Sequence, residues 1–179
     1  MNPRIEHLAQ KKLVGLSMKM SLSQNKTGQL WGQFGPRVKE IKNRLSDDKI
    51  SMQIYDDAYY QQFSPDNEFE KWATVEVADF NDIPNGMNAF TLASGQYAVF
   101  DYKGSSADSS IFQYIFWQWL PNSMYEVDDR PHFEVLGPKY RNNDPNSEEE
   151  IWIPSISKSE HAKTSKYELV TKYSLRICI

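Results

Sequence analysis

Residues 95–104, GQYAVFDYKG, and residues 11–20, KKLVGLSMKM, are the two stretches that decide how this chain folds. The earlier one alternates apolar and polar residues, as a strand with one buried face does, and the later one is also strand-like. Each is followed by a helical pattern and then by two more strand-like runs. We therefore expect the second half of the chain to repeat the first.

The first repeat is predicted as a strand at 12–22, a helix at 27–45 and strands at 50–56 and 72–80. The helix is predicted because apolar residues recur there at spacings of three and four, with Gly35-Pro36 marking a kink or a restart. These apolar residues are Leu30, Phe34, Val38, Ile41 and Leu45.

The second repeat begins with an extra strand, because Ser94-Gly95 breaks the apolar run at 86–104 in two. A helix at 106–120 follows, which Pro121 is expected to end, and strands are predicted at 131–137 and 150–155. The fold class is thus α+β, with two βαββ repeats related by a pseudo-two-fold axis and an antiparallel sheet. The repeat places SMQIYD on HFEVLG, so Gln53 is predicted to correspond to Glu134.

Composition excludes several classes of protein. The 179 residues carry 20 basic and 24 acidic side chains, so the clustered positive charge of a strong nucleic-acid binder is missing. The net charge of −4 is uneven: after Ser155 there are five bases and two acids, a balance of +3, which leaves −7 for residues 1–154. The sequence contains neither a membrane-length apolar run nor a signal peptide, and we expect a cytoplasmic location.

The sequence predicts neither a metal nor a cofactor. Its single cysteine, Cys178, excludes a disulfide scaffold or a cysteine-rich zinc site. The three histidines, at positions 7, 132 and 161, are far apart in sequence and lack ligand spacing. The glycines at 28, 32 and 35 are not followed by the Gly-Lys-Ser/Thr of a phosphate-binding loop.

Four motifs in fixed order carry a family resemblance: GMNAFTLASGQYAVFDYKG, FWQWLPNSMYE, DRPHFEVLGP and EEIWIP. Together they resemble the GyrI-like small-molecule-binding domain, which is the effector-binding domain of AraC-type and multidrug-responsive transcription regulators. The resemblance covers about residues 3–156. It implies a duplicated βαββ architecture with a central groove that takes bulky, often cationic, aromatic compounds. We expect residues 1–156 to form this domain and residues 157–179 to be a basic tail outside the family pattern.

The resemblance also implies ligand-binding residues. Glu134 matches the acidic residue that contacts the cation, and Glu150 matches a second acid, with Trp152 as the aromatic two residues later. Glu150 and Trp152 share a face of their strand, which would put a carboxylate beside an indole, and a cation over such a ring gains about 0.5–2 kcal/mol.

Glu134 is also singled out by its surroundings, because it lies in the apolar strand Phe133–Leu136. A carboxylate removed from water without a partner costs several kcal/mol and would recruit a cation or a proton. Two alternatives remain open at this point. Glu134 could face solvent on the polar side of the strand, or it could pair with Arg130 or Lys139.

The aromatic residues of the second helix are mostly expected in the core, yet they are more numerous than one sheet face can cover. Some of them, with aromatic residues on nearby strands, are therefore expected to line the groove. The predicted ligand-binding residues besides the two acids and Trp152 are Gln53, Tyr55, Tyr97, Tyr114 and Trp117.

These observations predict a standalone binder of bulky, hydrophobic and cationic small molecules, with a sensing, regulatory or sequestering role. No residues are left for a DNA-binding module, so a direct nucleic-acid or membrane partner is not expected. The expected macromolecular partner is a protein, such as gyrase or a regulator, or a second copy of the chain in a homodimer. One alternative is a hydrolase of cyclopropane-type genotoxins that uses Glu134, which shares a strand face with His132. Another is a gyrase-modulating protein that acts through its surface.

Overall fold

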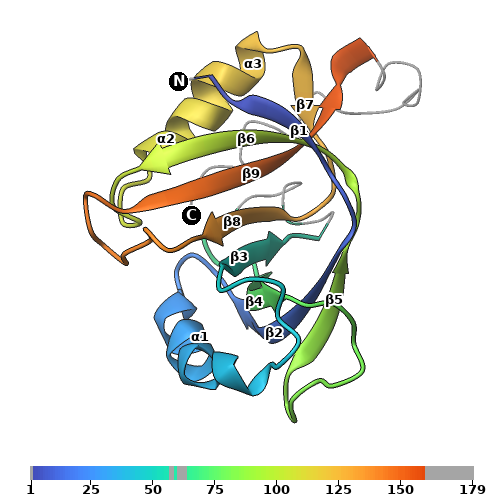
Figure 1. The fold of residues 1–179 in the computed structure, drawn as a ribbon. Coiled ribbons are helices and arrows are strands. Elements are labelled where there is room, and N and C mark those ends of the chain that lie inside the picture. The colour runs from blue at the N-terminus through green and yellow to red at the C-terminus, as the bar shows by residue number, and fades with distance from the viewer. Residues whose placement is uncertain (1, 57–58, 60–63, 160–179) are drawn as a thin grey trace.

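The computed structural model describes residues 2–56, 59 and 64–159. The basic tail predicted at 157–179 therefore lies almost entirely outside the described residues. Within them the fold is a mostly antiparallel nine-stranded sheet with helices packed on one of its faces (Figure 1). The strands are β1 (Arg4–Leu8), β2 (Lys11–Met20), β3 (Lys49–Ile54), β4 (Phe69–Glu76), β5 (Asn88–Leu92), β6 (Gly95–Lys103), β7 (Tyr125–Val127), β8 (His132–Leu136) and β9 (Glu148–Ser157).

Both predicted helices form, although the first ends at Glu40 and not at residue 45 and the second begins at Ser110 and not at residue 106, and both change their winding part-way. Helix α1 (Thr27–Phe34) continues as the 3₁₀ helix η1 (Gly35–Glu40), at the Gly35-Pro36 position where a kink was predicted. The second helix runs through α2 (Ser110–Gln113), the π-helical segment η2 (Tyr114–Trp119) and α3 (Leu120–Asn122). Pro121 does not end it at Leu120, since α3 reaches Asn122. π-Helical turns are rare and are frequent at functional sites.

The strand order confirms the predicted duplication. It is β1-β6-β9-β8-β3-β4-β2-β5, with β7 paired to β9, so β8 and β3 meet at the centre and each half presents the same sequence of strands outward. Strands β1 and β7 were not predicted from the sequence. Strand β1 leads directly into β2 yet pairs with β6, while β5 leads into β6 and pairs with β2. Each repeat therefore supplies an edge strand to the other, which ties the two halves together.

The pairing registers fix which residues of the two repeats correspond. Leu8 pairs with Gly95 and Leu92 with Lys11, which superposes β2 on β6 as the sequence predicted. Met18 of β2 then corresponds to Tyr102 of β6. Because Met18 pairs with Lys71 and Tyr102 pairs with Glu149, Lys71 of β4 is equivalent to Glu149 of β9.

The same registers place Ser51 on Glu134, because Ser51 pairs with Ala73 just as Glu134 pairs with Ile151. The prediction that Gln53 corresponds to Glu134 is therefore wrong by two residues. The apolar patterns of SMQIYD and HFEVLG match equally well after a two-residue shift, because side chains in a strand alternate with period two. Ser51 and Glu134 also pair directly with each other, so the pseudo-two-fold axis passes between them.

Three apolar clusters define the two faces of the sheet. Helix α1 packs with Leu30 and Phe34 on strands β2 and β4, and the second helix packs with Ile115 and Phe116 on β6 and β9. The third cluster contains strand residues only, among them Tyr97 and Phe133. We call the side of the sheet that the two helices cover the helix face, and the side that carries the third cluster the opposite face. Because the helices cover the outer strands, the central strands β3 and β8 lie between them on the helix face (Figure 1).

Candidate functional site

The central strands carry polar side chains on the helix face, where a core residue would normally be apolar. Ser51 and Gln53 of β3, Lys71 of β4 and His132 of β8 are all buried, and Glu134 lies among them. The registers bring them together, because Gln53 pairs with both Lys71 and His132, and Ser51 pairs with Glu134. We call Ser51, Gln53, Lys71, Glu134 and Glu149 the axial strip. Buried polar groups are costly unless they are paired, so such a strip at the centre of a fold indicates a functional site.

Glu134 is held by two neighbours on the helix face. The Lys71 Nζ lies 3.7 Å from its Oε2, and the two side chains are only 5% and 13% exposed. Gln53 donates from Nε2 to Glu134 Oε1 at 3.3 Å. Glu134 thus neither faces solvent nor pairs with the two cations considered from the sequence: Arg130 binds Asp128 at 2.6 Å and Lys139 binds Glu148 at 2.8 Å.

Burial dominates the electrostatics of Lys71. Desolvation lowers the pKa of its ammonium group, and the nearby carboxylates of Glu134 and Glu149 only partly oppose this effect. At 3.7 Å the ion pair with Glu134 is longer than a hydrogen bond. The pair is therefore close enough to compensate charge but is not locked by a short hydrogen bond.

Glu149 is the second carboxylate of the strip, and sequence reasoning missed it. Burial, together with the charge of Glu134, raises its pKa to about 7, although Lys71 acts in the opposite direction. No hydrogen bond or ion pair to the Glu149 carboxylate occurs among the described residues. Under the pseudo-two-fold axis Glu149 takes the position of Lys71, so the two halves bring opposite charges to the same place. Only the pairing registers reveal that equivalence, because the residues differ in charge.

An aromatic wall borders one end of the axial strip. The Tyr55 ring lies 4.6 Å from Tyr59, 5.4 Å from Phe69 and 6.0 Å from His132, measured between centroids. His132 in turn stacks on Phe116 of the π-helical segment at 6.0 Å. The prediction of Tyr55 as a wall residue therefore has a geometric basis, and His132 joins two parts of that wall.

Tyr114 and Trp117, the two ligand-binding residues predicted on the second helix, both belong to its π-helical segment η2. Tyr114 is half-buried and packs against the cluster between this helix and strands β6 and β9. Trp117 is 55% exposed.

A hollow of about 500 Å³ opens mainly on the opposite face, where Asp101 of β6, Val135 of β8 and Glu150 of β9 line it. Five carboxylate side chains line it against two lysines, and Glu149 is one of the five. The lining residues are Asp48, Asp101, Tyr102, Lys103, Val135, Gly137, Pro138, Lys139, Glu148, Glu149 and Glu150.

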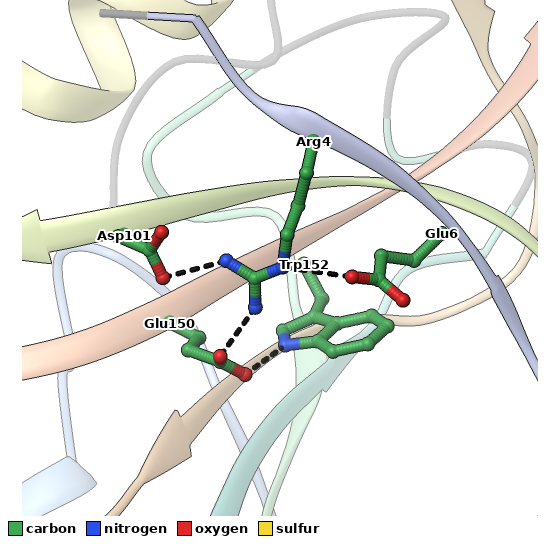
Figure 2. A network of polar contacts seen from close by, with 5 residues as sticks. All are labelled: Arg4, Glu6, Asp101, Glu150 and Trp152. Carbon is green, nitrogen blue, oxygen red and sulfur yellow. Dashed lines mark hydrogen bonds and ion pairs between the residues drawn. The ribbon is translucent and has the colours of Figure 1, made fainter.

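Glu150 and Trp152 lie on the opposite face, as Figure 2 shows. The Trp152 Nε1 donates to Glu150 Oε2 at 3.0 Å, so the predicted contact between carboxylate and indole exists. The place of a cation beside them is taken by Arg4 of β1, which binds Glu150 and also Asp101 at 2.6 Å and Glu6 at 2.9 Å.

Tyr97 also belongs to the opposite face. Its side chain is fully buried beside Phe133 and Trp152, and the Arg130 guanidinium lies 4.6 Å from its ring centroid. Its hydroxyl donates to the Pro131 carbonyl at 3.3 Å, and burial raises its pKa to about 12. The residues predicted for one groove are thus divided between two faces: Gln53, Tyr55 and Glu134 on the helix face, and Tyr97, Glu150 and Trp152 on the other.

Comparison with known proteins decides the family. Residues 4–154 match Cass2, the integron-associated effector-binding proteins. The chain belongs to this family. The resemblance to the GyrI-like effector-binding domain is thereby confirmed, and with it a domain class that binds small molecules. None of the helices in the described residues has the length and apolarity needed to span a membrane.

Relatives of the Cass2 domain include a regulator and several solved structures. The transcriptional regulator BrlR of Pseudomonas aeruginosa is 32% identical over 156 residues, which cover 86% of this chain but only 55% of BrlR. SAV2435, solved with tetraphenylphosphonium bound, has a TM-score of 0.64 at 19% identity, with 92% of this chain and 100% of that chain covered. The Vibrio cholerae integron cassette protein VCH_CASS2 has a TM-score of 0.57 at 14% identity, over 87% of this chain and 96% of that one.

Proposed function

We propose that this Cass2 domain binds bulky aromatic cations at the axial strip on its helix face and acts as the sensing unit of a regulatory system. The observation that carries the proposal is the charge of the strip. Two carboxylates, Glu134 and Glu149, face one ammonium group, Lys71. Ionisation of both carboxylates leaves one negative charge without a counter-ion in a largely buried setting, which a cationic ligand would neutralise.

The surroundings of the strip support a ligand that is both aromatic and cationic. The wall of Tyr55, Phe69, His132 and Phe116 offers ring faces and edges, and aromatic pairs gain about 0.5–1.5 kcal/mol beyond area burial. The positive charge of the ligand is matched by the strip itself, where the carboxylates of Glu134 and Glu149 outnumber the ammonium group of Lys71.

The relatives support the same reading. SAV2435 was solved with tetraphenylphosphonium, an aromatic cation. At 19% sequence identity, its likeness to this chain is one of fold. BrlR is a transcriptional regulator, and this chain spans about half of its length. We therefore infer that ligand binding in this domain serves a regulatory response, with the DNA-directed step made elsewhere in the system.

Tetraphenylphosphonium and tetraphenylborate test the proposal as a matched pair, because they share shape and size and differ in the sign of their charge. Isothermal titration calorimetry at pH 8 is expected to show saturable binding of the phosphonium and at least about ten-fold weaker binding of the borate, equivalent to 1.4 kcal/mol. Equal affinities would contradict a cation site. Binding of neither compound would contradict the proposed function.

A further inference from the structure

Within the axial strip, Gln53 has a fully buried side-chain atom without a hydrogen-bond partner in the described part of the chain. Its residue is 1% exposed, and its amide nitrogen donates to Glu134. Its amide oxygen, Oε1, is buried and has no hydrogen-bond partner among the described residues. A buried acceptor left without a donor costs about 1–3 kcal/mol, so such groups are rare without a functional reason.

The orientation of this amide is fixed by its neighbour. Turning the group over would place Oε1 against the Glu134 carboxylate, where two acceptors would repel each other. It would also remove the 3.3 Å hydrogen bond from Nε2. The oxygen is therefore the end of Gln53 that remains to be satisfied.

The rest of the strip is also rich in acceptors. Glu134 and Glu149 offer four carboxylate oxygens, whereas the charged donor on this strip is Lys71, 3.7 Å from Glu134. A permanently quaternary cation, such as a phosphonium or a tetraalkylammonium, would supply positive charge but no hydrogen atom to donate. A protonated amine or an amidinium supplies both.

Resting on the proposed function, we infer that the ligands to which this site is matched are aromatic cations that carry N–H donors, with Gln53 Oε1 accepting one of those hydrogens beside the two carboxylates. The aromatic body packs against Tyr55, Phe69 and His132, and the ammonium or amidinium group lies over the strip. Gln53 is then a specificity-determining residue, which separates N–H cations from quaternary ones of the same shape.

The test compares two ligands that share their aromatic body and their charge, (biphenyl-4-yl)methylammonium, which has three N–H donors, and its N,N,N-trimethyl derivative, which has none. Their affinities for the full chain are measured by calorimetry at pH 8, where the primary amine is still mostly protonated. We expect the primary ammonium to bind at least about ten-fold more tightly. The trimethyl compound is the more hydrophobic of the two, so burial of apolar surface alone predicts the reverse order.

The variant Gln53→Met keeps about the size of the side chain and removes the whole amide, that is, the unpaired oxygen and the Nε2 donor to Glu134. The ten-fold difference is expected to fall to two-fold or less, while binding of the trimethyl compound changes little. Equal affinities of the two ligands for the wild-type chain, or tighter binding of the trimethyl compound, overturn the inference but leave the proposed function intact. If neither ligand binds, the proposed function fails and the inference fails with it. The wild-type comparison decides the matter even if the variant folds poorly.

Discussion

Glu149 and Glu150 are adjacent in β9, yet they lie on opposite faces of the sheet and in opposite electrostatic situations. Glu150 is bound by Arg4 and by the Trp152 indole, at the half-exposed edge of the sheet where β1 pairs with β6 (Figure 2). Glu149 faces the buried axis beside Glu134 and Lys71 and has a pKa of about 7. Both faces combine an excess of carboxylates with one internal cation, but only on the helix face is that excess largely shielded from water.

This difference shows which face can accept a ligand's charge. On the opposite face one guanidinium meets three carboxylates through separate contacts, in a setting where Arg4 is 35% and Asp101 77% exposed and water screens what remains. On the helix face one buried ammonium faces two partly buried carboxylates and cannot neutralise both. Burial turns a small excess of negative charge into a strong preference for a cation.

Removing the internal cation of the helix face is expected to give the largest effect. In Lys71→Gln the side chain can still donate to Glu134, but its positive charge is gone. We expect the affinity for tetraphenylphosphonium to rise by about 10- to 100-fold, because Lys71 no longer competes for the same carboxylates. Calorimetry at pH 8 measures the change. Lys11→Gln, which removes a lysine paired with Glu76 far from the strip, is the control and is expected to leave the affinity unchanged.

The pH dependence of binding should reveal Glu149. A bound cation favours the ionised carboxylate, so the pKa of Glu149 falls below 7 in the complex and a proton is released on binding. Affinity is then expected to rise about ten-fold between pH 6 and pH 8 and to level off above pH 8.

A glutamine variant separates Glu149 from its neighbours in that experiment. Glu134, Lys71, Tyr102 and Tyr140 are the other titratable groups that interact with Glu149, and burial raises the pKa values of both tyrosines, away from this range. In Glu149→Gln the slope between pH 6 and pH 8 should disappear. A slope that persists would assign the proton to another group.

Stability should respond to the same residue with a defined sign. Because the pKa of Glu149 is raised from 4.5 to about 7, the folded state holds its proton more tightly than the unfolded state does. The ionised side chain therefore destabilises the fold, by an amount that grows from about pH 4.5 to pH 7 and is complete above pH 7. We expect Glu149→Gln to raise the free energy of unfolding by about 1–2 kcal/mol at pH 8 and by far less at pH 5, measured by urea denaturation.

Breaking the network of the opposite face should give the smallest effect and a different kind of effect. Arg4→Met is expected to cost about 1 kcal/mol of stability at low salt and less in 1 M salt, since its contacts are half-exposed. Cation affinity should not change. A loss of affinity on substituting Arg4 would mean that the opposite face takes part in binding.

The fold was largely readable from the sequence, whereas the site was readable only in part. Strand alternation and helix spacing predicted both repeats, and the resemblance to the effector-binding family singled out Glu134. Strands β1 and β7 were not predicted, because each is short and pairs with a strand remote in sequence. The equivalence of Gln53 and Glu134 was wrong because period-two patterns do not fix register.

The key partners of Glu134 could not be predicted for a related reason. Lys71 is distant in sequence and reaches Glu134 only because β3 lies between β4 and β8. Glu149 stands beside Glu150 in an acidic run, and only its strand parity assigns it to the helix face. Sequence reasoning selected Glu150 from the family pattern, and the structure gives that residue an internal partner, Arg4.

The central claim is that the helix face, and not the opposite face, receives the cation, and two neighbouring residues test it directly. Calorimetric titration of tetraphenylphosphonium at pH 8 is compared for the wild-type chain, Glu149→Gln and Glu150→Gln. The two variants remove the same charge from adjacent positions of one strand. The account predicts that Glu149→Gln weakens binding by about ten-fold or more, while Glu150→Gln stays within two-fold of the wild type. Loss of binding in Glu150→Gln with unchanged binding in Glu149→Gln would contradict it.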